Sequence, residues 1–236
     1  MIVGVTDSMD RSEFGGNVVQ QRHAFDIALK ELKLKLLHMG GDIQEALRQA
    51  IESLRQVDPV KARTLIENDR LVNRQEHDIE DLCIRLIATQ QPVATDLRKI
   101  VAGMRISADL ERMGDLAVDI AKSALRLEGQ TLIKPLVDIP KMAKIIDQMI
   151  SDALNAYVEN NVELAQNLAK ADDEVDHIYR SIVEELFSLS VEHPQVVSQA
   201  MTLAFVGRYL ERIGDHATNI GEGVIYIISG ERSDLN

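Results

Sequence analysis

The chain has few of the residues that cross-link a small fold or fill an aromatic core. Its 236 residues include no Trp, a single Cys and only 3% aromatic side chains. One cysteine excludes an internal disulfide, and Cys83 lies between Leu82 and Ile84, which is typical of a small buried hydrophobic residue. The core must therefore be built from Leu, Ile, Val, Ala and Met. Since strands favour aromatic and β-branched residues, this composition favours helices packed on helices.

Positive charge and long apolar runs are also scarce. The net charge is −12 and the pI is near 5.0, so a phosphate backbone would repel the surface and nucleic acid is excluded as an expected partner. The longest stretch without a formal charge, residues 193–207, is too short and too polar to span a bilayer. Residues 1–17 lack the basic end and apolar run of a signal peptide. We expect a soluble cytoplasmic protein without a membrane span.

The apolar residues recur with helical spacing between the proline positions. Four of the five prolines stand at the heads of periodic segments, where a missing N–H costs nothing: Pro59, Pro92, Pro140 and Pro194. Asp58 and Asp138 are candidate N-caps beside two of them. The pattern predicts six helices and almost no strand, with these ranges: 18–56, 60–89, 92–128, 140–158, 162–190 and 194–229.

An internal repeat organises these helices. Residues 110–120 read LERMGDLAVDI and residues 210–220 read LERIGDHATNI, with seven of eleven positions identical at an offset of 100. A fainter match pairs Asp69-x-x-x-Asn73 with Asp172-x-x-x-Asp176. The sequence therefore predicts an all-α fold of two tandem three-helix bundles related by duplication, with the first in residues 18–130 and the second in residues 138–230.

The repeated motif puts acidic residues on the side of each helix opposite its apolar stripe. At about 100° per residue, the polar sectors contain Glu111, Asp115 and Asp119 in the first copy and Glu211, Asp215 and Asn219 in the second. Glu111/Asp115 and Glu211/Asp215 are like-charge i,i+4 pairs, which destabilise a helix by a few tenths of a kcal/mol. A bound cation is the simplest reason to duplicate such a pair. The alternative is a solvated acidic face held by pairs such as Asp109/Arg112.

The preceding helix of each half supplies further oxygen ligands. In antiparallel hairpins that turn near residues 90 and 192, the Asp69 motif lies level with Glu111, and the Asp172 motif lies level with Glu211. Oxygen ligands without cysteine suit magnesium, calcium, manganese or iron. The candidate metal ligands are Asp69, Asn73, Glu111, Asp115, Asp119, Asp172, Asp176, Glu211, Asp215 and Asn219. His216, next to Asp215, is the histidine best placed to add a ligand.

Two other classes of protein remain open on these residues. A ferritin-like di-iron enzyme needs Glu-x-x-His on two helices, and Glu174-x-x-His177 supplies it once, whereas Leu71 and Arg74 stand at the equivalent places of the first half. A structural helical adaptor needs no metal. Nucleophilic triads, Gly-rich phosphate loops and CxxC sites are missing from the sequence, so we expect no enzyme activity.

Several segments resemble the PhoU family of phosphate-uptake regulators. LERMGDLAVDIA and LERIGDHATNIGE look like the paired E(D)xxxD motifs of that family. ATQQPVATDLRKIVAGMRISADLERMGD resembles its most characteristic stretch, and HAFDIALKELKLKLLHMGGDIQEAL resembles its opening helix. The resemblance covers residues 21 to about 230, nearly the whole chain. It implies two three-helix bundles that carry multinuclear metal clusters on the acidic motifs.

The resemblance also implies a function and partners. It implies a non-enzymatic negative regulator of phosphate uptake and phosphate-starvation signalling, a homodimer that contacts the ATPase of the phosphate ABC transporter and a sensor histidine kinase. The expected cofactors are divalent or ferric ions: iron, manganese, zinc or magnesium. The expected location is the cytoplasm, with peripheral attachment to the inner membrane face through these partners. Asn73 and Asn219 replace carboxylates of the family pattern, so the second half has the more complete acidic set.

Overall fold

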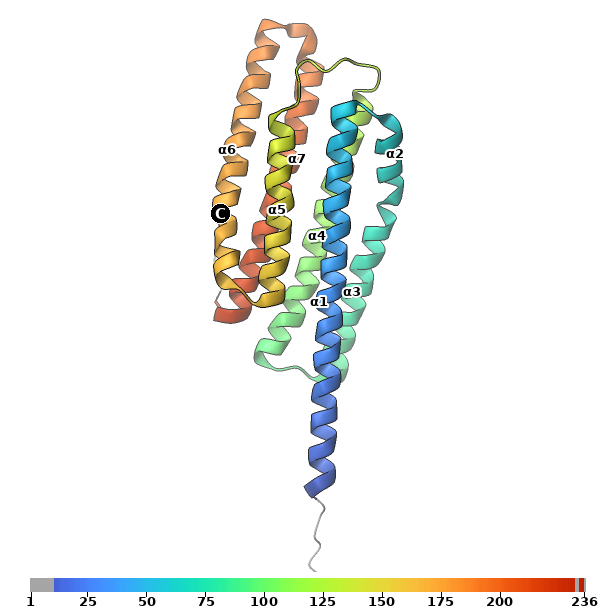
Figure 1. The fold of residues 1–236 in the computed structure, drawn as a ribbon, viewed down its shortest axis with the longest axis vertical. Helices are drawn as coiled ribbons and strands as arrows, with labels where there is room; N and C mark the ends of the chain where they lie inside the picture. The colour runs from blue at the N-terminus through green and yellow to red at the C-terminus, as the bar shows by residue number, and fades with distance from the viewer. Residues whose placement is uncertain (1–10, 232–233, 236) are drawn as a thin grey trace, which may run out of the picture.

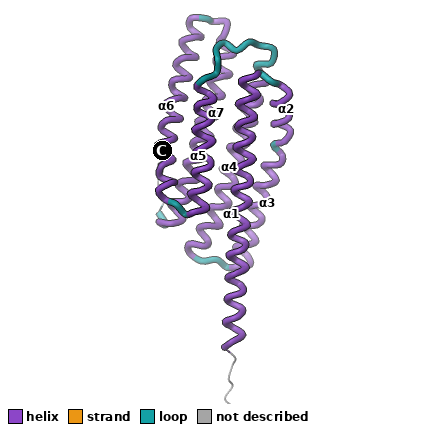
Figure 2. The backbone as a smooth tube through the Cα atoms, viewed as in Figure 1, coloured by secondary structure: helices purple, strands orange, loops and turns teal. Residues whose placement is uncertain are grey.

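The computed structural model describes the backbone of residues 11–231 and 234–235, and side chains from residue 22 onward. The expectation about a signal peptide in residues 1–17 therefore lies largely outside the described residues. The described part contains helices and loops but no strand (Figure 2), which confirms the all-α prediction. Its elements are α1 (Arg11–Gln56), α2 (Pro59–Asn68), α3 (Arg70–Gln90), α4 (Ala94–Arg126), α5 (Asp138–Glu159), α6 (Val162–Glu192), η1 (Pro194–Val196) and α7 (Val197–Ser229).

The second predicted helix, residues 60–89, is wrong as a single element. It is divided at Asp69 into α2 and α3, and the junction is tightened by a 3.0 Å bond from the Val72 N–H to the Asp69 carbonyl. The apolar spacing continues across this break, since Leu65 and Val72 are both buried. Because the apolar pattern is uninterrupted, the sequence gives no sign of the break at Asp69. The corresponding helix of the second half, α6, is continuous.

Several predicted helix starts also differ from the structure. The first helix begins at Arg11 and not at residue 18, and α4 begins at Ala94, two residues after Pro92. Asp58 is an N-cap as predicted, because its carboxylate accepts from the Val60 and Lys61 N–H groups. Asp138 instead is the first residue of α5 and makes no side-chain cap bond. Pro194 begins the 3₁₀ turn η1, and the α-helix starts only at Val197.

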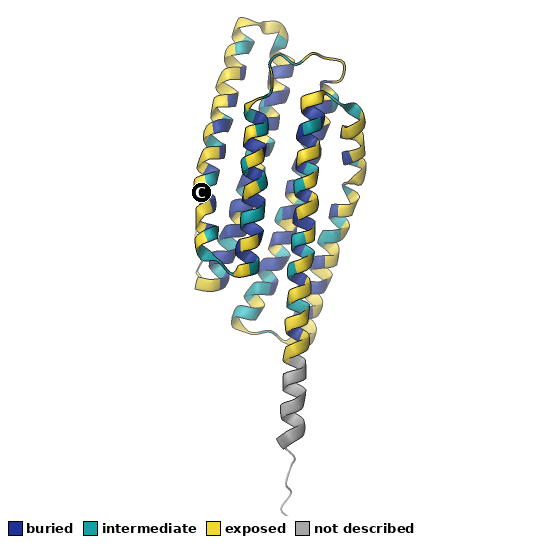
Figure 3. Ribbon diagram, in the orientation of Figure 1, coloured by how far each residue is buried: buried dark blue, intermediate teal, exposed yellow. Residues whose placement is uncertain are grey.

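The two halves share one hydrophobic core. In Figure 1, α4 and α7 run antiparallel beside each other, α3 packs on α1 and α4, and α6 packs on α5 and α7. The buried residues form one contiguous cluster with members from both repeats, and they line the inward sides of the helices in Figure 3. Cys83 belongs to this cluster and is fully buried, as expected. The duplicated bundles therefore stabilise each other through apolar contact across α4 and α7.

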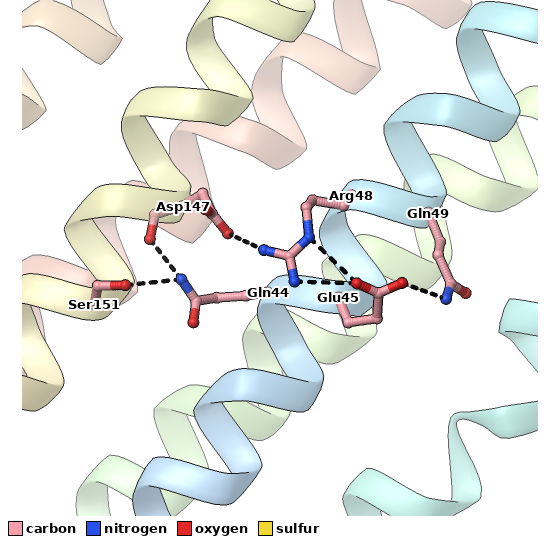
Figure 4. Close-up of polar contacts among 6 residues, drawn as sticks. All are labelled: Gln44, Glu45, Arg48, Gln49, Asp147 and Ser151. Carbon is pink, nitrogen blue, oxygen red and sulfur yellow. Dashed lines mark hydrogen bonds and ion pairs between the residues drawn. The ribbon is translucent and has the colours of Figure 1, made fainter.

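Polar contacts fix the second junction between the halves, where α1 meets α5 (Figure 4). The Gln44 side-chain amide donates to the Asp147 carbonyl and to the Ser151 hydroxyl, both at 2.9 Å. The Arg48 guanidinium donates to the Asp147 carboxylate at 3.1 Å and also to Glu45. These bonds join residues about 100 positions apart and set the register of α1 on α5.

The loop between the halves is held by a buried side chain of α7. Gln199 is 6% exposed, accepts from the Ile133 N–H at 2.5 Å and donates to Gln130 and Thr131 at 3.1 and 3.2 Å. Because each polar group of Gln199 is bonded, its burial is favourable. Among the described helices, none has the length and apolar character needed to cross a membrane.

Candidate metal centre

The structure brings the acidic motifs of the second half together between α6 and α7. Asp172 and Asp176 face this junction from α6, and Glu211 and Asp215 face it from α7. The four carboxylates are close enough that Asp215, Asp176 and Glu211 each help to raise the pKa of Asp172. The helices approach closely because residue 214 is glycine: a Cβ there would lie 3.2 Å from Asp172 Oδ1.

Asp172 is the most deeply placed of these acids. The residue is 9% exposed, and its Oδ1 atom is buried without a hydrogen-bond partner. Burial, followed by repulsion from Asp215, Asp176 and Glu211, raises the pKa of Asp172 to about 7. A buried carboxylate oxygen without a donor is costly in the folded chain. A cation in contact with this oxygen would remove that cost.

Glu211 repeats the same features on α7. Its side chain is 13% exposed, its Oε2 atom is buried without a partner, and its other oxygen is paired with Arg208. Burial and then Asp215 raise the pKa of Glu211, while Arg208 opposes the shift. The pKa of Asp215 is also raised by burial. Asp176 is more exposed, at 44%, and pairs with Arg180 at 3.5 Å.

The first half forms a looser version of this cluster. Glu111 is 16% exposed, and its pKa is raised by burial and then by Asp115. Burial and Asp115 likewise raise the pKa of Asp69. The Asn73 Oδ1 atom is buried without a partner, as is Asp172 Oδ1 in the second half. The acidic side is therefore partly covered by the neighbouring helix in both repeats, rather than fully solvated.

Three further residues have neighbours that the sequence did not indicate. Asp119 is 39% exposed and pairs with Lys122 at 2.9 Å. Asn219 lines a cavity of about 400 Å³ between α4 and α7. Glu76 contributes to the raised pKa of Glu111. The sequence analysis did not identify Glu76 because it lies outside the repeated motif.

The sequence interpretation named two histidines of the second half, His216 and His177. His216 Nδ1 is 2.9 Å from the Asp109 carboxylate of α4, so this histidine bridges the two repeats. Glu174 is 53% exposed and pairs with Lys141, and His177 is exposed. The Glu-x-x-His spacing of α6 therefore points to the surface and not toward a shared interior site.

The carboxylate oxygens of the second half are ligands that suit a hard cation, but Asp176 and Glu211 would have to rotate to reach a common ion. In the part of the chain that the structure describes, no three acidic, histidine or cysteine side chains already converge closely enough to hold a metal ion. Asp176 and Glu211 are turned toward Arg180 and Arg208. The orphaned oxygens of Asp172 and Glu211 would supply two ligands, and Asp176 would join them by leaving Arg180.

Comparison with known proteins gives a consistent family assignment. A family model for the PhoU domain matches residues 36–124 and, a second time, residues 139–224. A phosphate-specific transport system accessory protein PhoU homolog of Clostridium acetobutylicum is 42% identical over 216 residues, which cover 91% of this chain and 99% of that protein. The phosphate-specific transport system accessory protein PhoU of Escherichia coli is 32% identical over 207 residues, covering 88% and 86%.

Solved structures agree with this assignment. The crystal structure of PhoU from Pseudomonas aeruginosa superposes with a TM-score of 0.83 at 34% identity, covering 88% of this chain and 100% of that one. The phosphate transport system regulatory protein PhoU from Streptococcus pneumoniae also gives a TM-score of 0.83, at 30% identity, covering 89% and 99%.

Proposed function

The chain belongs to the PhoU family, and from this premise we propose that it is an accessory protein of a phosphate transport system that represses phosphate uptake and phosphate-starvation signalling. Its relatives are named as accessory proteins of phosphate-specific transport, which supports a role exerted by binding without catalysis. The partners in this proposal are the transporter ATPase and a sensor histidine kinase, reached in the cytoplasm by a homodimer.

The proposal includes a metal-binding regulatory site. Asp172, Asp176, Glu211 and Asp215 would hold a cation in the second half, and Asp69, Asn73, Glu111 and Asp115 would hold a weaker one in the first. The observation that carries this is the pair of orphaned buried oxygens, Asp172 Oδ1 and Glu211 Oε2. A cation such as iron, manganese, zinc or magnesium would supply positive charge at that point. Arg180 and Arg208 then become free to meet other groups.

The regulatory role predicts a defect in phosphate repression. Deleting the gene is expected to leave the phosphate-starvation response switched on in phosphate-rich medium, because the restraint on the kinase and transporter is lost. A reporter of that response, measured in low and high phosphate, tests this. Re-expression of the intact chain is the control. Normal repression in the deletion strain, with no second copy of the gene to compensate, would leave the structural adaptor as the better account.

The metal site predicts a chelator-sensitive melting temperature. An ion that binds only the folded chain at 100 times its Kd adds about 2.7 kcal/mol, or roughly 5–10 °C in Tm for a chain of this size. Chelator should therefore lower Tm, and added Mn²⁺ should restore it. Glu211→Gln with Asp215→Asn should remove most of this response. The solvated-face alternative predicts no chelator effect and a more stable double variant. Turnover of ferrous iron to ferric iron would instead favour the di-iron enzyme.

A further inference from the structure

Six exposed apolar side chains gather near the turn that joins α6 to α7. They are Val183, Phe187 and Val191 on α6, and Val197, Met201 and Phe205 on α7, here named the hairpin patch. Phe187 is 70% exposed, Val191 65% and Met201 55%, although burial of apolar side chains of this size is favourable. Each helix contributes residues at i, i+4 and i+8, so both stripes run along their helix axes.

The two stripes lie on the same side of the hairpin. Gly207 of α7 faces α6, where an added Cβ would be 3.0 Å from Tyr179. Counting along the antiparallel helices from this contact places Val183 within two residues of the level of Phe205, and Phe187 within two residues of the level of Met201. At about 100° per residue, both stripes turn from the contact toward one face. The hairpin patch is therefore a ladder of three apolar rungs about 6 Å apart.

The same face becomes charged beyond the last apolar rung. Arg180 and Arg208 come next along the hairpin, one on each helix, and they are paired with Asp176 and Glu211. Four carboxylates of the candidate metal centre follow, against these two arginines. The face is thus polarised along its length, with apolar side chains near the turn and excess negative charge toward its middle.

The first repeat shows that the fold does not require this surface. The positions that correspond to the hairpin patch are Glu80, Ile84 and Ala88 on α3 and Leu97, Val101 and Arg105 on α4. A charged residue replaces an apolar one at two of the six places, and alanine replaces valine at a third. Because both hairpins pack on the shared core, the extra apolar area of the second hairpin needs an explanation outside the fold.

We propose that the hairpin patch and the acidic face beside it bind an amphipathic helix of a partner protein, apolar at one end and basic at the other. Two antiparallel helices leave a groove that accepts the apolar stripe of a third. In the metal-free chain, the apolar end of the partner helix lies between Phe187 and Met201, and its basic end meets the carboxylates around Asp176, so that a cation bound there competes with the helix. That the chain has a protein partner rests on the proposed function. The arrangement of the hairpin patch and the acidic face does not.

Charge selects this occupant over two others. A second copy of the chain would either place two acidic faces against each other or leave each acidic face without a positive partner. The net charge of −12 on each copy adds to the repulsion. An anionic lipid surface would meet the same repulsion. A helix with lysine or arginine at one end satisfies both parts of the groove, and its binding is expected to weaken with salt.

The test uses the full chain and a labelled synthetic helix as the probe. The peptide has about 15 residues, with leucine at helical spacing in one half and lysine in the other, and its scrambled form serves as the control peptide. Fluorescence anisotropy should show saturable binding of the patterned peptide only. Phe187→Ser with Met201→Ser should weaken it at least tenfold. Ile84→Ser with Leu97→Ser, the exposed positions of the first hairpin, should leave it unchanged.

Other outcomes overturn the inference. Equal binding by both double variants, or equal binding of the scrambled peptide, would show that the groove does not select a helix. Sedimentation that shows a dimer lost in the Phe187→Ser, Met201→Ser variant would assign the patch to a second copy. Binding to anionic vesicles lost in that variant would assign it to a membrane. If the peptide binds as expected but deletion of the gene leaves repression normal, this inference stands and the proposed function fails.

Discussion

Asp172→Asn is expected to raise the free energy of unfolding of the metal-free protein at pH 8 by roughly 2 kcal/mol, and Tm by about 4–8 °C. The variant removes a charge that is buried, lacks a donor to Oδ1 and is repelled by four other carboxylates. Thermal melts in excess chelator measure the effect. Asp173→Asn is the matched control, because this exposed neighbour loses the same charge and is the weakest of the four carboxylates that repel Asp172.

The pH dependence of this effect has a definite sign. Because the pKa of Asp172 rises from 3.8 in the unfolded chain to about 7 in the folded one, its contribution to stability is greatest at low pH. That contribution is lost as the pH rises through about 7. The advantage of Asp172→Asn over the wild type should therefore grow from pH 5 to pH 8.

Bound Mn²⁺ should reverse the order of the melting temperatures of the wild type and Asp172→Asn. Mn²⁺ is expected to raise the Tm of the wild type and to have little effect on Asp172→Asn, because the variant loses an anionic ligand. A metal-free variant that melts below the wild type at pH 8 would mean that Asp172 makes a favourable contact inside the junction. A variant that keeps the full response to Mn²⁺ would place the ion elsewhere.

Gly40→Ala and Gly41→Ala are expected to change stability in opposite directions. A Cβ at Gly40 would lie 2.1 Å from the Leu154 side chain of α5, which is 3% exposed and has little room to move. Overpacking of this kind costs about 1–3 kcal/mol, which exceeds the gain of roughly 1 kcal/mol from replacing a helical glycine. We expect a net loss of up to about 2 kcal/mol.

Gly41 provides the control on the next residue of the same helix. Nothing lies within 4 Å of a Cβ built there, and the residue is exposed. Gly41→Ala should therefore stabilise the chain by about 0.5–1 kcal/mol through helix propensity alone. Urea unfolding of both variants measures the difference. A stabilising Gly40→Ala would show that α1 and α5 can move apart without loss, and that the close approach is not needed.

The apolar periodicity was sufficient to predict the helices because each one buries a single stripe against the core. It could not predict the break at Asp69, where Leu65 and Val72 keep the same phase on both sides. It also could not show that Asn219 lines a cavity between α4 and α7, since a helical wheel gives the direction of a side chain and not which neighbouring helix lies there.

The sequence by itself determined the helical class, the duplication and the acidic residues of the motifs, because these depend on spacing within single helices. Only the tertiary structure decided which of those acids lose water. Asp172 and Glu211 have buried orphan oxygens because Gly214 lets α6 and α7 approach, while Asp119 keeps its lysine at the surface. The tertiary structure also put the exposed stripes of α6 and α7 on one face. Burial and adjacency between helices depend on how their axes pack, which no local sequence pattern contains.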